Sequence, residues 1–147
     1  MPKKVVKPFR FDLRAAQKYL SSLSPNADTE FIDVLNALSL KCRVASDTWW
    51  HTPSGRLKKR NKGELLMLMV SELAEAMEGE RKDLMDDKLP HRRMAEVELA
   101  DAIIRLMDYA GAYGFDIGGA VIEKMAFNAK RPDHKLKNRL KKNGKKF

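Results

Sequence analysis

Two stretches decide the fold, GELLMLMVSELAEAMEGERK (63–82) and MAEVELADAIIRLMDYAGAYG (94–114). Both repeat apolar residues at helical spacing. Each also carries a pair of acids, Glu72 with Glu75 in the first and Glu98 with Asp101 in the second. Acids spaced i, i+3 leave one face of a helix with Cβ atoms about 5–6 Å apart. Because the interval between the pairs is long enough for a turn, we expect two antiparallel helices whose four carboxylates converge.

The surroundings of these acids leave two interpretations open. Glu72 lies within the apolar stripe of its own helix, where an unpaired carboxylate would be costly. A hard divalent cation would neutralise the cluster. Alternatively, Arg105 follows Asp101 by four residues and could pair with these acids in a surface stripe that continues to Asp108. Spacing alone does not choose between a metal site and an ion-pair stripe.

The composition predicts one globular, mostly helical domain. The chain has 147 residues, of which 44% are hydrophobic and 33% charged, with only eight Gly and six Pro. Cys42 is the sole cysteine, so no intrachain disulfide can form, and its apolar surroundings predict a core residue. The longest apolar run, 65–70, is far too short to span a membrane. With no apolar segment after the N-terminal lysines, we expect a cytoplasmic protein without membrane association.

The net charge of +9 is concentrated at the two ends of the chain. Residues 1–10 and 130–147 are strongly basic, whereas acids slightly outnumber bases between them. A basic end is typical of a solvated tail and also attracts polyanions. Nucleic-acid binding is therefore an alternative function, although it does not explain acids embedded in an apolar stripe.

Helical periodicity and capping residues predict an all-α chain. We expect a single domain over 9–132 between a basic extended arm (1–8) and a basic C-terminal tail (133–147). Within it, Val121, Ile122, Met125 and Phe127 are predicted to face inward. The expected fold resembles a four-helix bundle with an additional N-terminal helix. The predicted helices cover 9–19, 29–46, 63–82, 91–112 and 117–130, with a loop at 46–63 and a turn at 83–90.

The two acid pairs resemble the E-x-x-E and E-x-x-D motifs of the all-α nucleoside triphosphate pyrophosphohydrolases of the MazG type. The segment EKMAFNAKRPDHK (123–135) is similar to the second motif of that family, with Lys124, Asn128, Arg131 and Pro132 at matching offsets. The resemblance runs from about Asn61 to the C-terminus and closely matches small single-domain phage and bacterial members. Both motifs in order are more specific than the carboxylates alone.

The resemblance implies Mg²⁺-dependent cleavage of a nucleoside triphosphate between its α- and β-phosphates, with Mn²⁺ as a substitute ion. It implies that Glu72, Glu75, Glu98 and Asp101 bind the metal and act in catalysis. One departure concerns Ser71, which stands where many members carry a further glutamate. A serine cannot act as a carboxylate base, which puts any role of that extra acid in doubt.

The same resemblance implies a substrate site and an oligomer. Lys124, Asn128 and Arg131 would contact the triphosphate, although the residues alone favour a solvated helix end. Of Trp49 and Trp50, one is expected to seal the core and the other could stack on a base. A homo-oligomer, a dimer or tetramer, is implied, in the host cytoplasm if a phage encodes the chain. A catalytically degenerate interaction protein is a further alternative, for which Ser71 is the only indication.

Overall fold

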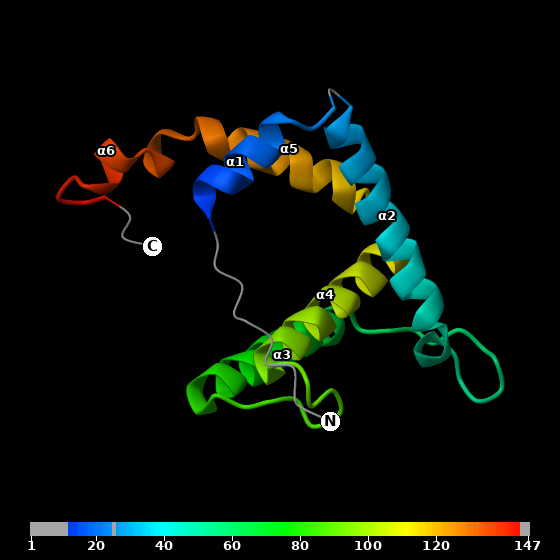
Figure 1. The fold of residues 1–147 in the computed structure, drawn as a ribbon. Coiled ribbons are helices and arrows are strands. Elements are labelled where there is room, and N and C mark those ends of the chain that lie inside the picture. The colour runs from blue at the N-terminus through cyan, green and yellow to red at the C-terminus, as the bar shows by residue number, and fades with distance from the viewer. Residues whose placement is uncertain (1–11, 25, 145–147) are drawn as a thin grey trace.

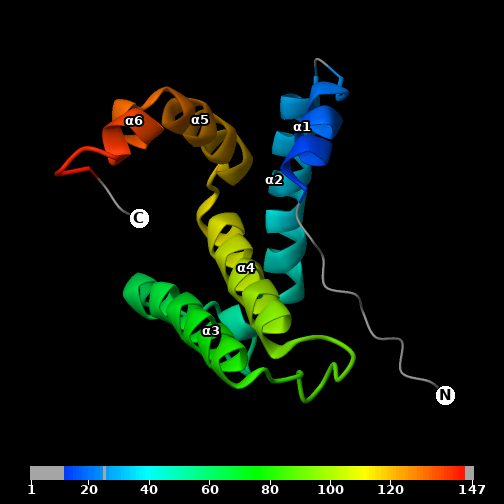
Figure 2. The ribbon, with the colours of Figure 1, turned by 60° about the vertical axis from the view of Figure 1, so that its left-hand side comes forward.

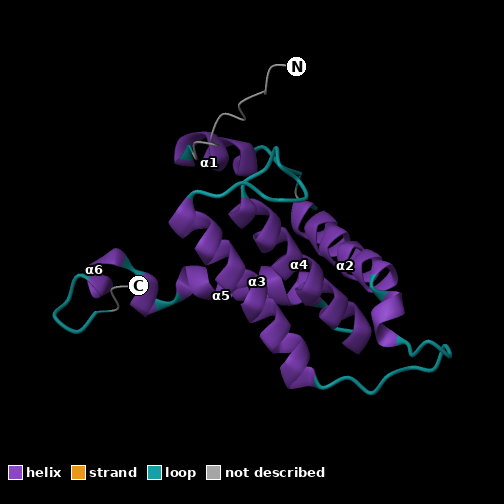
Figure 3. Ribbon diagram, turned by 90° about the horizontal axis from the view of Figure 1, so that it is seen from below, coloured by secondary structure: helices purple, strands orange, loops and turns teal. Residues whose placement is uncertain are grey.

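The computed structural model describes residues 12–24 and 26–144, and in these ranges all regular structure is helical, as predicted. Figure 3 shows helices joined by loops. The predicted arm 1–8 and the start of the predicted helix 9–19 lie outside the described residues. The α-helices are α1 (Leu13–Ser21), α2 (Ala27–Ala45), α3 (Lys62–Lys82), α4 (Met94–Tyr113), α5 (Ile117–Lys130) and α6 (Leu136–Arg139), and the 3-10 turns are η1 (Asp47–Trp50) and η2 (Pro132–His134).

Helix α4 lies at the centre of the arrangement (Figures 1 and 2). It packs against α3 on one side and α2 on another, and α2 in turn packs against α5. Extensive contacts therefore run in series, α3–α4–α2–α5, through the described part of one chain. The all-α fold is confirmed, but these residues do not close a four-helix bundle within a single chain. No described helix combines the length and apolar character needed to cross a membrane.

Small residues let α3 and α4 approach closely. Ala76 and Ala95 are buried at their contact. At Gly79, an added Cβ would lie 3.0 Å from both the Ala95 nitrogen and the Met94 Cβ. This spacing is tighter than a packed interior normally allows, so the crossing of the two helices requires glycine there. The close crossing brings the acids of α3 beside those of α4.

Helix α5 packs on α2 through glycine rather than through large apolar side chains. A Cβ at Gly118 would lie 2.5 Å from the Ile32 carbonyl oxygen, and the Gly118 N–H donates to Asn36 Oδ1 at 2.9 Å. The prediction that Met125 and Phe127 face inward is wrong for a single chain, because their side chains are 64% and 58% exposed. The glycine face of α5 lies against α2 and leaves these side chains in solvent.

The predicted boundaries of α3 and α5 agree with the structure to within one residue, whereas α1 and α2 differ from their predicted ranges. Asp12 accepts hydrogen bonds from the N–H groups of Arg14 and Ala15, so α1 begins later than predicted. Helix α4 begins at Met94 rather than 91. The buried Asp86 carboxylate accepts from the N–H groups of Lys88 and Leu89, which holds this segment as a turn.

One chain leaves extended apolar stripes exposed. On α3, four large apolar side chains at helical spacing are about half exposed, and α4 carries a second such stripe. No large side chain of the described residues is fully buried. Surfaces of this kind are typical of protein interfaces. The α3 stripe is Leu66, Val70, Leu73 and Met77, and the α4 stripe is Leu99, Ile103 and Leu106.

Candidate metal centre and adjoining pocket

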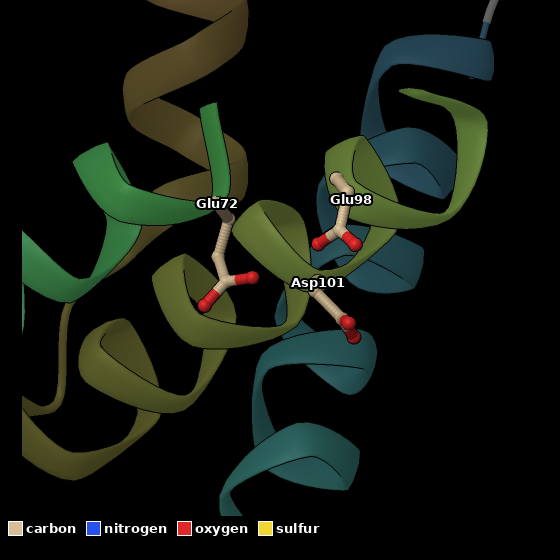
Figure 4. A group of neighbouring side chains, drawn as sticks. All are labelled: Glu72, Glu98 and Asp101. Atoms are coloured by element: carbon tan, nitrogen blue, oxygen red, sulfur yellow. The ribbon is translucent and has the colours of Figure 1, made fainter. Parts of the chain in front are cut away.

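Three of the four predicted metal ligands come together where α3 crosses α4. Glu72 projects from α3 beside Glu98 and Asp101 on α4 (Figure 4). Each side chain offers one carboxylate oxygen, and these three oxygens lie within 4.8 Å of one another. Glu72 is buried, Glu98 is half-buried and Asp101 is exposed. Glu75 is exposed and lies outside this group of oxygens, although its charge reaches Glu98.

The donor set suits Mg²⁺ or Mn²⁺. All three donors are carboxylate oxygens, which hard cations prefer. Mg²⁺ bonds of about 2.0–2.1 Å hold ligand oxygens at most about 4.2 Å apart. In an octahedral shell at least two of the three pairs of oxygens would be adjacent ligands, about 2.9 Å apart, so an ion would draw the three side chains closer together through changes of rotamer. The carboxylates therefore suit a divalent cation by the type of donor they offer.

Arg105 is the counter-ion of Glu72. Its Nε donates to Glu72 Oε1 at 2.7 Å, and the Arg105 side chain is 43% exposed while that of Glu72 is 9% exposed. The ion pair that the sequence offered as an alternative to metal binding therefore forms at Glu72. Arg105 does not enclose the cluster, because Glu98 and Asp101 make no ion pair within 4.0 Å in the described part of the chain.

The clustered charges perturb Glu98. Desolvation raises the pKa of Glu98 to about 6, with further contributions from a hydrogen bond with Glu72 and from the charges of Glu75, Glu72 and Asp101. Each cause disfavours the ionised form of Glu98. A bound cation would reverse this effect, because it favours the ionised form of every carboxylate around it.

A pocket of about 520 Å³ adjoins the cluster. Asp101 and Arg105 form its border with the carboxylates, and Asp108 lies further along the same face of α4. The remaining walls come from the residue after α2, η1, the following loop, the first half of α3 and further residues of α4. The pocket therefore combines apolar and aromatic walls with a few polar groups, as small-molecule sites commonly do. The other lining residues are Ser46, Trp49, Arg60, Leu65, Leu68, Ile104 and Tyr109.

The two adjacent tryptophans have different environments. Trp50 is 6% exposed, and its indole Nε1–H donates to both carboxylate oxygens of Asp108, at 3.1 and 3.0 Å. The guanidinium groups of Arg43 and Arg60 lie 4.9 and 5.7 Å from its ring centroid. Trp49 is 70% exposed and lines the pocket. Trp50 is thus the residue that seals the core, while the exposed Trp49 contributes to the wall of this pocket.

The predicted triphosphate-binding residues lie apart from the carboxylates in one chain. Lys124, Asn128 and Arg131 lie on or just after α5, which packs on α2 and η2 and has no extensive contact with α3 or α4. Lys124 Nζ lies 4.9 Å from the Phe127 ring centroid. Arg131 Nη2 donates to Asp133 at 2.6 Å. Asn128 Oδ1 is buried and accepts no hydrogen bond within the described residues.

A second hollow, of about 400 Å³, is strongly basic. Five cationic side chains line it, together with Trp50, Leu57, Ala112 and Tyr113, and no acid does. Lys58, Lys59 and Lys62 have no carboxylate within 4.0 Å in the described residues. The positive charge of the hollow would attract anions. The five cations are Arg43, Lys58, Lys59, Arg60 and Lys62.

Sequence reasoning missed Asp108 and Arg60 as pocket residues. Asp108 continues the Glu98, Asp101 and Arg105 stripe by three residues, which was a usable signal. Arg60 reaches the pocket from a loop, where spacing gives no guidance. Ser71 stands at the position of the missing glutamate. Its hydroxyl donates a hydrogen bond to the Leu68 carbonyl oxygen of the same helix, at 2.8 Å.

Comparison with protein-family models, with curated proteins and with solved structures found no match to this chain.

Proposed function

We propose that this chain is a Mg²⁺-dependent nucleoside triphosphate pyrophosphohydrolase. The observation that carries the proposal is the group of carboxylate oxygens from Glu72, Glu98 and Asp101, within 4.8 Å of one another, at the border of an aromatic pocket. The resemblance of the two acid motifs to the MazG type supports it as well. Glu75 completes the set as a ligand reached by a change of rotamer, because it leaves α3 one turn from Glu72.

The reaction joins a water oxygen to the α-phosphorus, breaks the bond to the α,β-bridging oxygen and releases pyrophosphate and a proton. Bound Mg²⁺, or Mn²⁺ in its place, supplies charge neutralisation on the phosphate oxygens and lowers the pKa of water. The carboxylates hold the ion and accept the proton. Arg60 and Arg105 line the pocket and offer guanidinium groups that match phosphate oxygens. Trp49 offers a ring face to the base.

The direct test measures pyrophosphate release from mixed nucleoside triphosphates with Mg²⁺. Glu98→Gln preserves the size of the side chain but removes its charge, and we expect turnover to fall by more than about 100-fold. The matched control is Glu96→Gln on the same helix, because Glu96 pairs with Arg92 at 2.6 Å on a different face of α4. Retained turnover in Glu98→Gln, or no turnover in the unmodified chain, would remove the proposal.

We further propose that the working form is a homo-oligomer, a dimer or a tetramer. The exposed apolar stripes of α3 and α4 support this, because their burial against a second copy would form the bundle that one chain leaves open. In such an oligomer, α5 of one copy would lie near the carboxylates of the other. Lys124, Asn128 and Arg131 would then contact the triphosphate of the neighbouring subunit.

The basic hollow favours nucleic-acid binding as a second candidate function. Its cations lie on α2, on the loop before α3 and at the first residue of α3. The basic ends of the chain add further positive charge. A phosphate backbone held this way dissociates steeply as salt rises. Replacing Lys58 and Lys59 by Gln together should lower the slope of oligonucleotide affinity against salt concentration without changing pyrophosphate release. An unchanged slope would exclude the hollow as the binding surface.

A further inference from the structure

One face of α4 carries a continuous row of charged side chains. Glu98, Asp101, Arg105 and Asp108 follow one another at spacings of three, four and three residues, so they lie on the same side of the helix. The last three of them line the pocket. Asp108 is two turns from Asp101, about 10 Å along the helix axis. This span is comparable to the length of a nucleotide from its α-phosphate to the far edge of its base.

Asp108 has unused capacity to accept hydrogen bonds. Its two oxygens share the Trp50 indole N–H, at 3.1 and 3.0 Å, and no other donor reaches it within the described residues. A carboxylate offers about four lone-pair sites, so acceptor sites remain, and Asp108 lines the pocket. It is also half-buried, where a hydrogen bond to a ligand is stronger than in open water. Asp108 can therefore accept hydrogen bonds from a ligand that presents donors.

The other walls of the pocket indicate the shape of that ligand. Trp49 contributes an exposed ring, while Leu65, Leu68 and Ile104 contribute apolar surface. Walls of this kind suit a flat heterocycle that stacks on an aromatic face. A nucleobase fits both requirements when the edge that meets Asp108 carries N–H groups.

The bases differ in what their pairing edges offer a carboxylate. Guanine presents two adjacent donors, the ring N1–H and the exocyclic 2-amine, which match two carboxylate oxygens. Adenine and cytosine place an acceptor nitrogen beside their amine, and uracil and thymine place carbonyls on both sides of their single N–H. Each of these would set a lone pair against the carboxylate, which is unfavourable.

We propose that the pocket takes guanine nucleotides and that Asp108 selects the base through the N1–H and the 2-amine. This inference depends on the proposed function for the place of the triphosphate. The base would stack on Trp49, and its sugar and phosphates would extend along α4 past Arg105 towards Asp101.

The first test compares guanosine with inosine triphosphate, which lacks only the 2-amine. A bidentate contact of this type discriminates by about 1–3 kcal/mol, so we expect kcat/KM to favour guanosine by about 10- to 100-fold. Equal values would overturn the inference. If the unmodified chain releases pyrophosphate from guanosine and inosine triphosphate at equal rates, the inference fails but the proposed function stands. If it releases pyrophosphate from neither nucleotide, the proposed function itself is refuted.

The second test changes the selecting group. Asp108→Asn keeps an oxygen for the Trp50 indole, so the fold is expected to survive. The amide adds a donor, which suits xanthine, because xanthine carries a carbonyl where guanine has the 2-amine. We expect the preference between guanosine and xanthosine triphosphate to reverse. Asp47→Asn, which alters an exposed partner of Arg43 outside the pocket, is the control and should leave the preference unchanged.

A binding measurement makes the test independent of turnover. The monophosphates of guanosine, inosine and xanthosine can be titrated against Trp fluorescence without hydrolysis. The unmodified chain should bind guanosine monophosphate most tightly, and Asp108→Asn should bind xanthosine monophosphate most tightly. If Asp108→Asn does not fold, as judged by circular dichroism, the comparison of guanosine with inosine in the unmodified chain decides. An Asp108→Asn chain that folds and keeps the guanine preference contradicts the inference.

Discussion

The α3–α4 crossing carries the acid pairs and α5 carries the second motif on which the proposed function depends. Within a single chain, the acids come together but the residues of α5 lie apart from them. The crossing buries Glu72 and gathers three carboxylates. Helix α5 keeps Lys124 away from them and exposes Met125 and Phe127. Local packing therefore suffices to assemble the acids, whereas the proposed part of Lys124 in the site would need a second copy of the chain.

The largest effect is expected from a charge placed in the exposed apolar stripe of α3, which would test whether copies of the chain associate there. Val70 lies in the middle of the exposed α3 stripe, and Val70→Glu places a charge where a second copy would pack. In a symmetric dimer the charge is buried twice, so the dissociation constant should rise by about 1,000-fold. Light scattering after size-exclusion chromatography measures this. Val44→Glu, on an exposed part of α2, should leave the molar mass unchanged. An unmodified chain that is monomeric would contradict the oligomer.

A subunit-mixing experiment examines α5 itself. Lys124→Ala and Glu98→Gln should each reduce pyrophosphate release by about 100-fold. If α5 serves the carboxylates of its neighbour, mixed dimers regain one complete site. Random mixing of the two inactive chains should then restore about a quarter of the original activity. Activity that stays at the level of the separate variants would show that Lys124 does not act across the interface, or not at all.

Replacing Arg105 tests whether the carboxylates at the α3–α4 crossing bind a cation. Its guanidinium holds Glu72 at 2.7 Å and so competes with a cation for that carboxylate. Arg105→Gln should therefore tighten Mn²⁺ binding by about 10-fold, measured as free Mn²⁺ by electron paramagnetic resonance. Arg92→Gln, which breaks the exposed pair with Glu96, is the matched control and should change little. Weaker Mn²⁺ binding in Arg105→Gln would show that the arginine supports the ion instead.

The smallest effect concerns pH. Because the pKa of Glu98 is raised to about 6, the folded chain binds this proton more tightly than the unfolded chain does. That contribution to stability is complete below the ordinary glutamate pKa of about 4.3 and is lost as pH rises through about 6. Thermal melts without divalent ions should show this fall, and Glu98→Gln should reduce it. A slope identical in both chains would contradict the assigned shift.

Helical spacing predicted the helices and the approach of three of the four acids, whereas Glu75 lies outside the cluster. Glu72, Glu98 and Asp101 needed only two periodic helices and a turn between them. Spacing also foresaw Arg105, but not whether it would pair with Glu72, because that depends on how α3 and α4 cross. Periodicity failed for Met125 and Phe127, since Gly118 lets α5 approach α2 with its small side. Asp12 shifted the start of α1 through a side-chain cap, and Asp86 holds the turn before α4, features that a repeat does not reveal.

The distance between the carboxylates of α3 and α4 depends on how closely the two helices pack at Gly79. This glycine lies two turns from Glu72 on α3, with its Cα against Ala95 and Met94. A methyl group at Gly79 would push α3 away from Ala95 and Met94 on α4. Because the helix is rigid, this displacement would also move Glu72 away from α4. A change far from any carboxylate would thus widen the gap between the oxygens of α3 and α4. If the cluster binds a divalent ion as proposed, its affinity for that ion would fall as the spacing between α3 and α4 widens.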